Sequence, residues 1–188
     1  MKSGREGREK AETLRVSRIC GLTPRQPKAR RAKNARFSMK TVRKSVLIWY
    51  SAHEMFELVR DVARYPEFLP WCSLGRVIGQ DADGKGMTAE VGIAFKGLKQ
   101  SFVTYNTHIA DRELRIQLVK GPFSTLNGLW TFTPVGQAGE RACRVTLALD
   151  YGFDSKALSA LVGPVFDKIA ATMVDAFIQR AEQVYGQP

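Results

Sequence analysis

Apolar and polar residues alternate along much of the second half of the chain. Within residues 87–95, 113–118 and 143–153, every second residue is apolar. A period of two is typical of β-strands that bury one face and expose the other to water. Turn-forming residues such as Gly121-Pro122 separate these runs. Together with a β-branched and aromatic run at residues 42–49, the pattern predicts an antiparallel sheet of about seven strands.

A short helix is predicted directly after the first strand. Ser51 and Glu54 have the spacing of a capping box, in which each side chain accepts a hydrogen bond from the other residue's backbone amide. The apolar residues that follow, up to Val62, recur on one helical face, and the helix is expected to end before Pro66. A second helical turn at Pro66–Trp71 would direct its own apolar side chains inward.

The end of the chain predicts one long helix over residues 155–185. Its apolar residues return at steps of three and four, and they are Leu158, Val162, Phe166, Ile169, Met173 and Phe177. Asp154 or Ser155 can cap its start. Pro164 cannot donate a hydrogen bond to residue 160, so a bend is expected there. One strand, two short helices, six strands and a long helix form an α+β order, in which the sheet curves around the C-terminal helix.

Positive charge is concentrated at the N-terminus. The chain has 188 residues, 44% of them hydrophobic, and a formal net charge of +11. Residues 1–38 hold twelve Lys and Arg against three Glu, a net charge of +9, which leaves +2 for residues 39–188. The latter length suits one domain with its own core. The basic segment has no apolar period, and we expect it to be a disordered extension.

Three interpretations of residues 1–38 are open. The segment resembles a mitochondrial presequence in its arginines, but Glu6, Glu9 and Glu12 are unusual for one. Its charge also suits an arm that contacts nucleic acid or a membrane. The third interpretation, which we favour, is that the natural chain starts at Met39, where a strand-like run begins, and that the preceding residues are an upstream extension.

The sequence offers little catalytic or metal-binding chemistry. It has two histidines, His53 and His108, and three cysteines, none of them at metal-ligand spacing from a second ligand set. Nucleophile, zinc-protease, phosphate-loop and dinucleotide motifs are missing. The inward positions that the pattern identifies are apolar, so we expect no catalytic residue, no metal and no enzymatic activity. The uninterrupted apolar runs are far shorter than the ~18–20 residues that span a bilayer, which predicts a soluble protein.

Aromatic and methionine side chains gather on the faces that the pattern turns inward. A curved sheet around one helix leaves a space that such side chains can line, and they form a compliant apolar wall. The alternative is an ordinary packed core, which for each residue alone is the better interpretation. As a set they are candidates for contacts with a hydrophobic ligand: Phe68, Phe102, Leu126, Trp130, Phe166, Met173 and Phe177.

Three segments carry a resemblance to a known family. They are Tyr65–Cys72 (YPEFLPWC), Gly121–Pro134 (GPFSTLNGLWTFTP) and Gly163–Tyr185, which begins with GPVF and ends with AEQVY. With the order of elements, they resemble the START-type family of coenzyme Q-binding proteins and ribosome-association toxins, within the polyketide cyclase/dehydrase-like superfamily. The resemblance implies a helix-grip fold over residues 39–186, with an apolar cavity between the sheet and the C-terminal helix.

The resemblance implies two functions. The one that the sequence favours is non-enzymatic binding or chaperoning of ubiquinone, or of a similar polyprenyl quinone, in support of respiratory electron transport. The alternative is a ribosome-associated toxin that binds the large ribosomal subunit and blocks subunit association. A basic cluster at one sheet edge would suit that second role, and its expected members are Lys96, Lys99, Arg112, Arg115 and Lys120.

The resemblance also bears on location. Because residues 1–38 make a poor presequence, we expect a bacterial cytoplasmic protein, with a peripheral contact at the inner face of the membrane left open. A genuine presequence would instead imply mitochondria. We expect no DNA partner, and no cofactor besides the quinone ligand.

Overall fold

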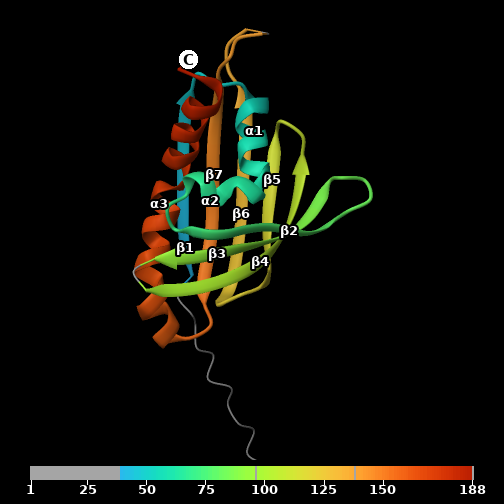
Figure 1. Cartoon of the computed structure of the whole chain (residues 1–188). Helices are drawn as coiled ribbons and strands as arrows, with labels where there is room; N and C mark the ends of the chain where they lie inside the picture. Colours follow the sequence, from blue (N-terminus) through green and yellow to red (C-terminus); the bar gives the residue numbers. More distant parts are fainter. Residues whose placement is uncertain (1–38, 96, 138, 188) are drawn as a thin grey trace, which may run out of the picture. The chain divides into compact units, whose positions relative to one another are not determined.

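The computed structural model describes residues 39–95, 97–137 and 139–187, so the predicted extension at residues 1–38 lies outside the described residues. Seven strands of the described part form one antiparallel sheet in the order β1-β7-β6-β5-β4-β3-β2 (Figure 1). The strands are β1 (Lys40–Ile48), β2 (Cys72–Gln80), β3 (Gly86–Phe95), β4 (Leu98–Ile109), β5 (Glu113–Lys120), β6 (Phe123–Pro134) and β7 (Cys143–Phe153). The predicted seven-stranded antiparallel sheet is confirmed.

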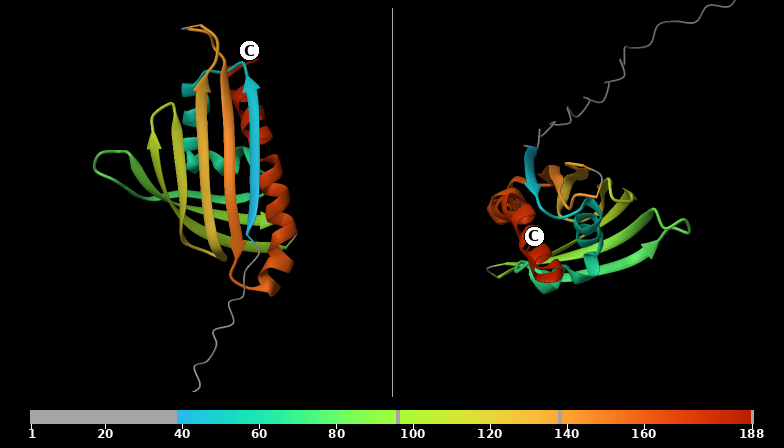
Figure 2. Two further views of the ribbon diagram at one scale, coloured as in Figure 1. Left: turned by 180° about the vertical axis from the view of Figure 1, so that it is seen from behind. Right: turned by 90° about the horizontal axis from the view of Figure 1, so that it is seen from above.

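Helices cover one face of this sheet and leave the other uncovered. They are α1 (Ala52–Arg60), a 3₁₀ turn at Val62–Arg64, α2 (Tyr65–Phe68) and α3 (Lys156–Tyr185). Seen from behind, β1, β7 and β6 lie in front of the helices, and seen from above the sheet curves around them (Figure 2). We call the helix-covered face the inner face and the uncovered face the outer face. The predicted helix-grip architecture, with two short helices after the first strand, is confirmed.

Helix α1 begins where the sequence predicts. The Ser51 hydroxyl accepts a hydrogen bond from the Glu54 amide at 3.2 Å, and the Glu54 carboxylate accepts one from the Ser51 amide at 2.8 Å. Arg141 donates to the same carboxylate from two nitrogens, at 2.7 and 3.0 Å. Burial raises the pKa of Glu54, but the hydrogen bonds outweigh it and hold this pKa below its ordinary value. The capping box therefore also ties α1 to the loop before β7.

The chain after α1 differs in detail from the prediction. We expected a helical turn at Pro66–Trp71, but α2 starts at Tyr65 and ends at Phe68. Pro66 occupies its first turn, where a backbone amide would have no intrahelical partner in any case. Trp71 is buried beyond the end of α2, whereas Phe68 is half-buried. The helical turn is shorter than predicted because strand pairing begins at residue 72.

Helix α3 packs along the inner face of β1 and β7. The Ser155 hydroxyl caps its first turn, and the helix continues through Pro164. Lys40 of β1 and Tyr151 of β7 both donate to the Asp167 carboxylate on α3, each at 2.5 Å. Burial raises the pKa of Asp167, but these two hydrogen bonds outweigh it, and the pKa lies below its ordinary value. These polar contacts fix α3 against the two strands.

The predicted apolar stripe of α3 is largely buried. Val162, Phe166, Ile169 and Phe177 are at most 3% exposed, while Met173 is half-buried. One 18-residue window of this helix has a mean hydropathy of 1.4, so that by length and composition alone the helix could cross a membrane. A search for uninterrupted apolar runs does not find this window. Single polar residues interrupt the runs but lower the mean hydropathy of the window only slightly. In the structure, 33% of the apolar window is buried against the domain.

Candidate functional site

The seven residues predicted to contact a ligand all belong to the core between the sheet and the helices. Four of them are at most 3% exposed, and three are half-buried and pack against the same core. The first group is Leu126, Trp130, Phe166 and Phe177, and the second is Phe68, Phe102 and Met173. The structure therefore brings the predicted residues together on the inner side of the sheet.

Their rings form two groups in direct contact. Phe177 lies 5.4 Å from Trp130 and 5.2 Å from Phe68, measured between ring centroids. The second group centres on Phe123, which the sequence analysis did not single out, and also contains Phe102, Phe153 and Phe166. Most of these pairs meet edge to face, the geometry that aromatic rings prefer in a packed core.

Most of the larger surface pockets of the described residues lie away from these rings. Five pockets with volumes of 140–420 Å³ are formed by described residues, and of the seven predicted residues only Phe68 lines one of them. That pocket, of about 140 Å³, lies between α1 and the end of α3 and also contacts Arg180 and Tyr185.

A polar row interrupts the apolar interior on β4. Thr104 and Asn106 are 2% and 4% exposed, and His108 follows them on the same inner face, where we expected apolar side chains. The Asn106 Oδ1 and the His108 Nδ1 are buried without a hydrogen-bond partner. The His108 ring lies 5.5 Å from that of Phe56. Burial, with a smaller effect from Arg60, lowers the pKa of His108, so this ring is neutral at pH 7.

Unpartnered polar atoms inside a protein are costly, and they usually bind water or a ligand. An amide oxygen and an imidazole nitrogen both accept hydrogen bonds, so this row suits a hydroxyl group. The signal for it in the sequence was the spacing of Phe102, Thr104, Asn106 and His108 at every second position. The sequence analysis missed this polar row because it identified inward positions by their apolar residues, and these inward residues are polar.

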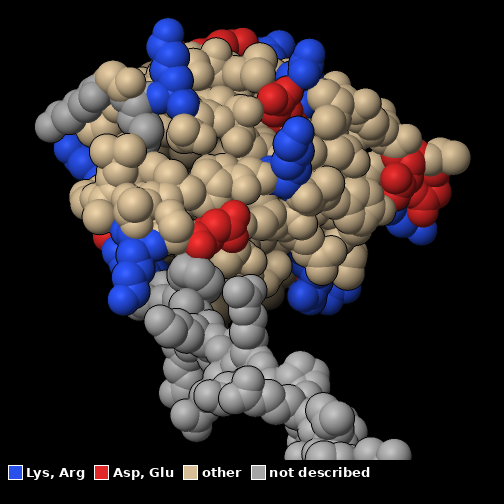
Figure 3. Space-filling model, turned by 90° about the horizontal axis from the view of Figure 1, so that it is seen from below, with Lys and Arg blue, Asp and Glu red and all other residues tan. Residues whose placement is uncertain are grey.

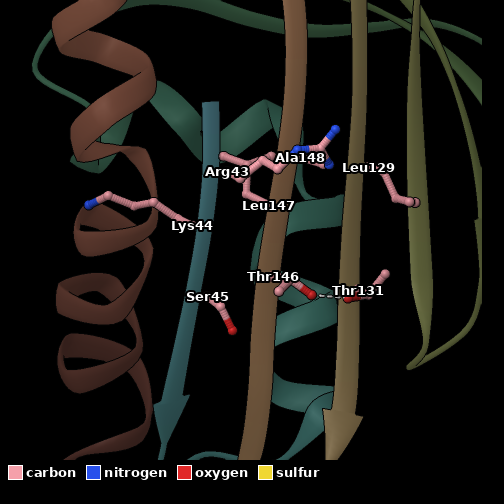
Figure 4. Close-up of a pocket in the computed structure, with 8 residues that line it drawn as sticks. All are labelled: Arg43, Lys44, Ser45, Leu129, Thr131, Thr146, Leu147 and Ala148. Atoms are coloured by element: carbon pink, nitrogen blue, oxygen red, sulfur yellow. Dashed lines mark hydrogen bonds between the residues drawn. The ribbon is translucent and has the colours of Figure 1, made fainter. Parts of the chain in front are cut away.

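A shallow groove crosses the outer face of the sheet (Figure 4). Strand register places Arg43, Ala148, Leu129 and Arg115 in one row across β1, β7, β6 and β5. Two pockets of about 340 and 420 Å³ share the first three of these residues, so they form one continuous depression. We call it the outer groove. Its polar walls contain Ser45, Gln117, Asn127, Thr131, Thr146 and Asp150.

The outer groove and the strand position beside it combine unpaired arginine side chains with hydroxyl groups. Among the described residues, neither Arg43 nor Arg144, two positions before Thr146 on the same face of β7, has an acidic partner. Thr131 and Thr146 share a hydrogen bond across β6 and β7, shown as a dashed line in Figure 4. Arg115 is paired with a glutamate of its own strand at 2.5 Å. Two guanidinium groups are therefore available to an anionic partner.

The basic cluster predicted at one sheet edge does not form as a set. Arg112 and Arg115 lie at the β4–β5 turn, whereas Lys120 ends β5 and Lys99 lies near the start of β4. Eight residues of extended chain separate Arg112 from Lys120 by roughly 26 Å, so the two cannot share one contact. Lys96 lies outside the described residues.

The chain is similar to known proteins over most of its length. Residues 48–178 match the family described as polyketide cyclase/dehydrase and lipid transport. The ribosome association toxin RatA of Vibrio cholerae is 44% identical over 149 residues, which cover 79% of this chain and 100% of that toxin. The mitochondrial coenzyme Q-binding protein COQ10 homolog B of Xenopus laevis is 28% identical over 145 residues, which cover 76% of this chain and 58% of that protein.

Solved structures share the architecture at low identity. A START superfamily protein from Mycobacterium smegmatis has a TM-score of 0.66 and 19% identity, covering 77% of this chain and 98% of the other. The Zhui aromatase/cyclase of a Streptomyces species has a TM-score of 0.66 and 12% identity, covering 80% of this chain and 100% of the other. At these identities the likeness shows the fold alone.

Proposed function

The chain belongs to the polyketide cyclase/dehydrase and lipid transport family, and from this premise we propose that it associates with ribosomal particles. The support is the degree of similarity, since the ribosome association toxin is matched over its whole length and the coenzyme Q-binding protein only in part. This similarity reverses the order in which the sequence analysis placed the two functions. Both relatives are named as a toxin or a binding protein, and the proposed function is likewise non-enzymatic.

The outer groove is the surface that carries this proposal. RNA offers a high density of phosphates, which arginine and hydroxyl side chains bind without regard to sequence. Arg43 lines the groove with the hydroxyls of Thr131 and Thr146, Arg144 lies on β7 two positions from Thr146, and neither arginine has an acidic partner among the described residues. The groove is shallow, as a contact with an extended RNA backbone requires. We propose the large subunit as the particle, and hence a cytoplasmic location.

Co-sedimentation with purified ribosomal subunits tests this proposal. The full chain is expected to sediment with the large subunit at 50 mM salt and much less at 200 mM, because phosphate contacts release counterions. Arg43→Glu combined with Arg144→Glu is expected to weaken association at least about tenfold and to reduce the slope of log K against log salt by roughly 1–2.

The matched control is Arg64→Glu combined with Lys85→Glu. These two side chains are 62% and 76% exposed, do not line the outer groove, and undergo the same change of charge. Their replacement is expected to leave most of the association intact. An equal loss in both double variants would argue against the outer groove, and a wild-type chain that stays in the supernatant at 50 mM salt would argue against ribosome association itself.

A second function, binding of a hydrophobic ligand, is favoured by the polar row of β4. We propose ubiquinone or a similar polyprenyl quinone in its reduced form, whose ring hydroxyls would donate to the Asn106 Oδ1 and the His108 Nδ1. The prenyl tail would gain about 0.8 kcal/mol for each methylene that it buries. Its contacts would be the predicted residues Phe68, Phe102, Leu126, Trp130, Phe166, Met173 and Phe177.

Asn106→Leu separates ligand binding from folding. Solvent extraction and mass spectrometry of the purified chain should recover quinone from the wild type and about fivefold less from this variant, since a hydrogen bond is lost. Unfolding in urea should show equal or higher stability, because a buried amide oxygen without a hydrogen-bond partner is removed. Gln117→Leu, at an exposed position of β5, is the control. A wild-type chain that carries no quinone and takes up none on addition would contradict this second function.

A further inference from the structure

The first half of α3 is apolar on both of its sides. The inward residues Val162 and Phe166 are only 1% and 3% exposed. The outward residues Ala157, Leu161 and Pro164 are exposed, and 66% of the Leu161 surface is accessible. A helix that packs on one side of a domain normally carries polar residues on the other. The outward side of this first half of α3 is therefore an apolar surface that no described residue covers.

A lysine lies at each end of this apolar stripe. Residues 157, 161, 164 and 168 fall within about 60° of one another around the helix axis, at 100° per residue. Lys168 closes the stripe on the same side, whereas Lys156 stands one residue before it, about 100° around the axis from Ala157 and about 18 Å from Lys168 along the helix. Neither lysine has an acidic partner among the described residues. We call residues 156–168 on this side the lysine-flanked stripe.

The end of the sheet beside the first half of α3 adds further exposed apolar and basic groups. Strand β1 begins there, since Lys40 donates to Asp167 of α3, and Met39 beside it is 64% exposed. The acidic groups at this end include that same Asp167, held by Lys40 and Tyr151, as well as Asp150, held by Thr41, and Asp154. Figure 3, which views the molecule from below, shows a largely uncharged surface with basic side chains and fewer acidic ones scattered over it.

We propose that the lysine-flanked stripe rests on the surface of an anionic lipid bilayer. Leu161 and its apolar neighbours would enter the boundary between head groups and acyl chains, with α3 lying in the plane of the membrane. Lys156 and Lys168 would extend their ammonium groups to lipid phosphates while their methylene stems cover apolar surface. This contact uses another surface than the outer groove, so it goes beyond ribosome association and does not depend on it.

Charge complementarity favours lipid over the other occupants. A second copy packed on the stripe about a twofold axis would bring lysines of both copies toward one interface, where like charges repel. RNA would meet the lysines but would leave Leu161 against hydrated phosphates, and the stripe offers no aromatic ring on which a base could stack. An anionic bilayer accepts the apolar and the basic groups together.

Co-sedimentation of the full chain with vesicles tests the proposal. One set of vesicles is phosphatidylcholine alone, and the other is an equal mixture of phosphatidylcholine and phosphatidylglycerol. The wild type is expected to prefer the mixed vesicles, and Leu161→Glu is expected to lower its partition coefficient at least about tenfold. The double variant Lys156→Glu and Lys168→Glu should lower the partition coefficient of the wild type by a factor of roughly five per lysine. This loss is expected on the mixed vesicles only.

Val184→Glu is the matched control, because Val184 lies at the other end of α3 and is 47% exposed. Every variant keeps residues 1–38, so their charge of +9 contributes equally throughout. The effect of Leu161→Glu should persist near 0.5 M salt, which screens charges but not apolar contacts. Equal partition of Leu161→Glu and Val184→Glu would overturn the proposal, and so would a wild-type dimer that Leu161→Glu converts to a monomer. Unchanged co-sedimentation of Leu161→Glu with ribosomal subunits is expected and separates this proposal from the proposed function.

Discussion

Replacing Trp130 by alanine is expected to lower the free energy of unfolding by about 3–5 kcal/mol. Trp130 is 1% exposed, lies parallel to Phe132 with 4° between the ring planes, and meets Phe177 edge to face at 5.4 Å. Removal of the indole leaves a cavity between β6 and α3, because the neighbouring rings are held by contacts of their own. A domain of this kind is stable by about 5–15 kcal/mol in total, so the loss is a large fraction of its stability.

Urea unfolding followed by far-ultraviolet circular dichroism measures this loss, and Trp49→Ala is the control. Trp49 is 63% exposed, so the same substitution there should change the stability by no more than about 0.5 kcal/mol. If Trp130→Ala behaved like Trp49→Ala, the indole would already border open space. That result would favour a ligand cavity over the packed core described above.

Replacing Gly75 by alanine is expected to cost about 1–3 kcal/mol, although it adds one methyl group. A Cβ atom at this position of β2 would lie 2.0 Å from the Val62 carbonyl oxygen and 3.2 Å from the Pro66 Cδ. The first distance is far inside van der Waals contact, and the oxygen belongs to the backbone of the 3₁₀ turn. Either the turn or the edge strand must therefore move, and the packing between them is lost.

Gly79→Ala provides a control on the same strand. Its Cβ would meet the Thr88 Cβ at 3.8 Å, an ordinary contact, so the substitution should be neutral or slightly stabilising. Thermal unfolding of both variants measures the difference. Equal losses at the two positions would attribute the effect to strand propensity rather than to the close approach of the 3₁₀ turn.

Local rules were enough to predict most elements of the fold. The Ser51 capping box involves residues three positions apart, and both of its hydrogen bonds are present. The period of two in the strands and of three to four in α3 reports which side of each element is buried, and the structure agrees. The end of α2 was predicted less well, since it depends on where β2 begins to pair with β3.

The candidate sites were predicted less completely. The period identified Trp130 and Phe177 as inward residues, but no pattern in the sequence says whether inward aromatic rings line a cavity or touch one another. Asn106 was not predicted as an inward residue, because its side chain is polar although it is buried. The outer groove was missed altogether, since it joins Arg43 to Leu129 and Ala148, which are distant in the sequence.

By itself, the sequence determined the order of the elements, the faces that they bury, the family and the separation of charge at Met39. These properties follow from residues that are neighbours along the chain, whose spacing is fixed by helix and strand geometry. Only the tertiary structure decided that the aromatic rings pack together, that Gly75 faces a backbone oxygen, that a row of four strands forms the outer groove, and that α3 leaves Leu161 exposed. Each of these features depends on strand register and on the packing of segments that are distant in the sequence. The hydrophobic period does not specify them, because it shows which side of an element is buried but not which other element packs against that side.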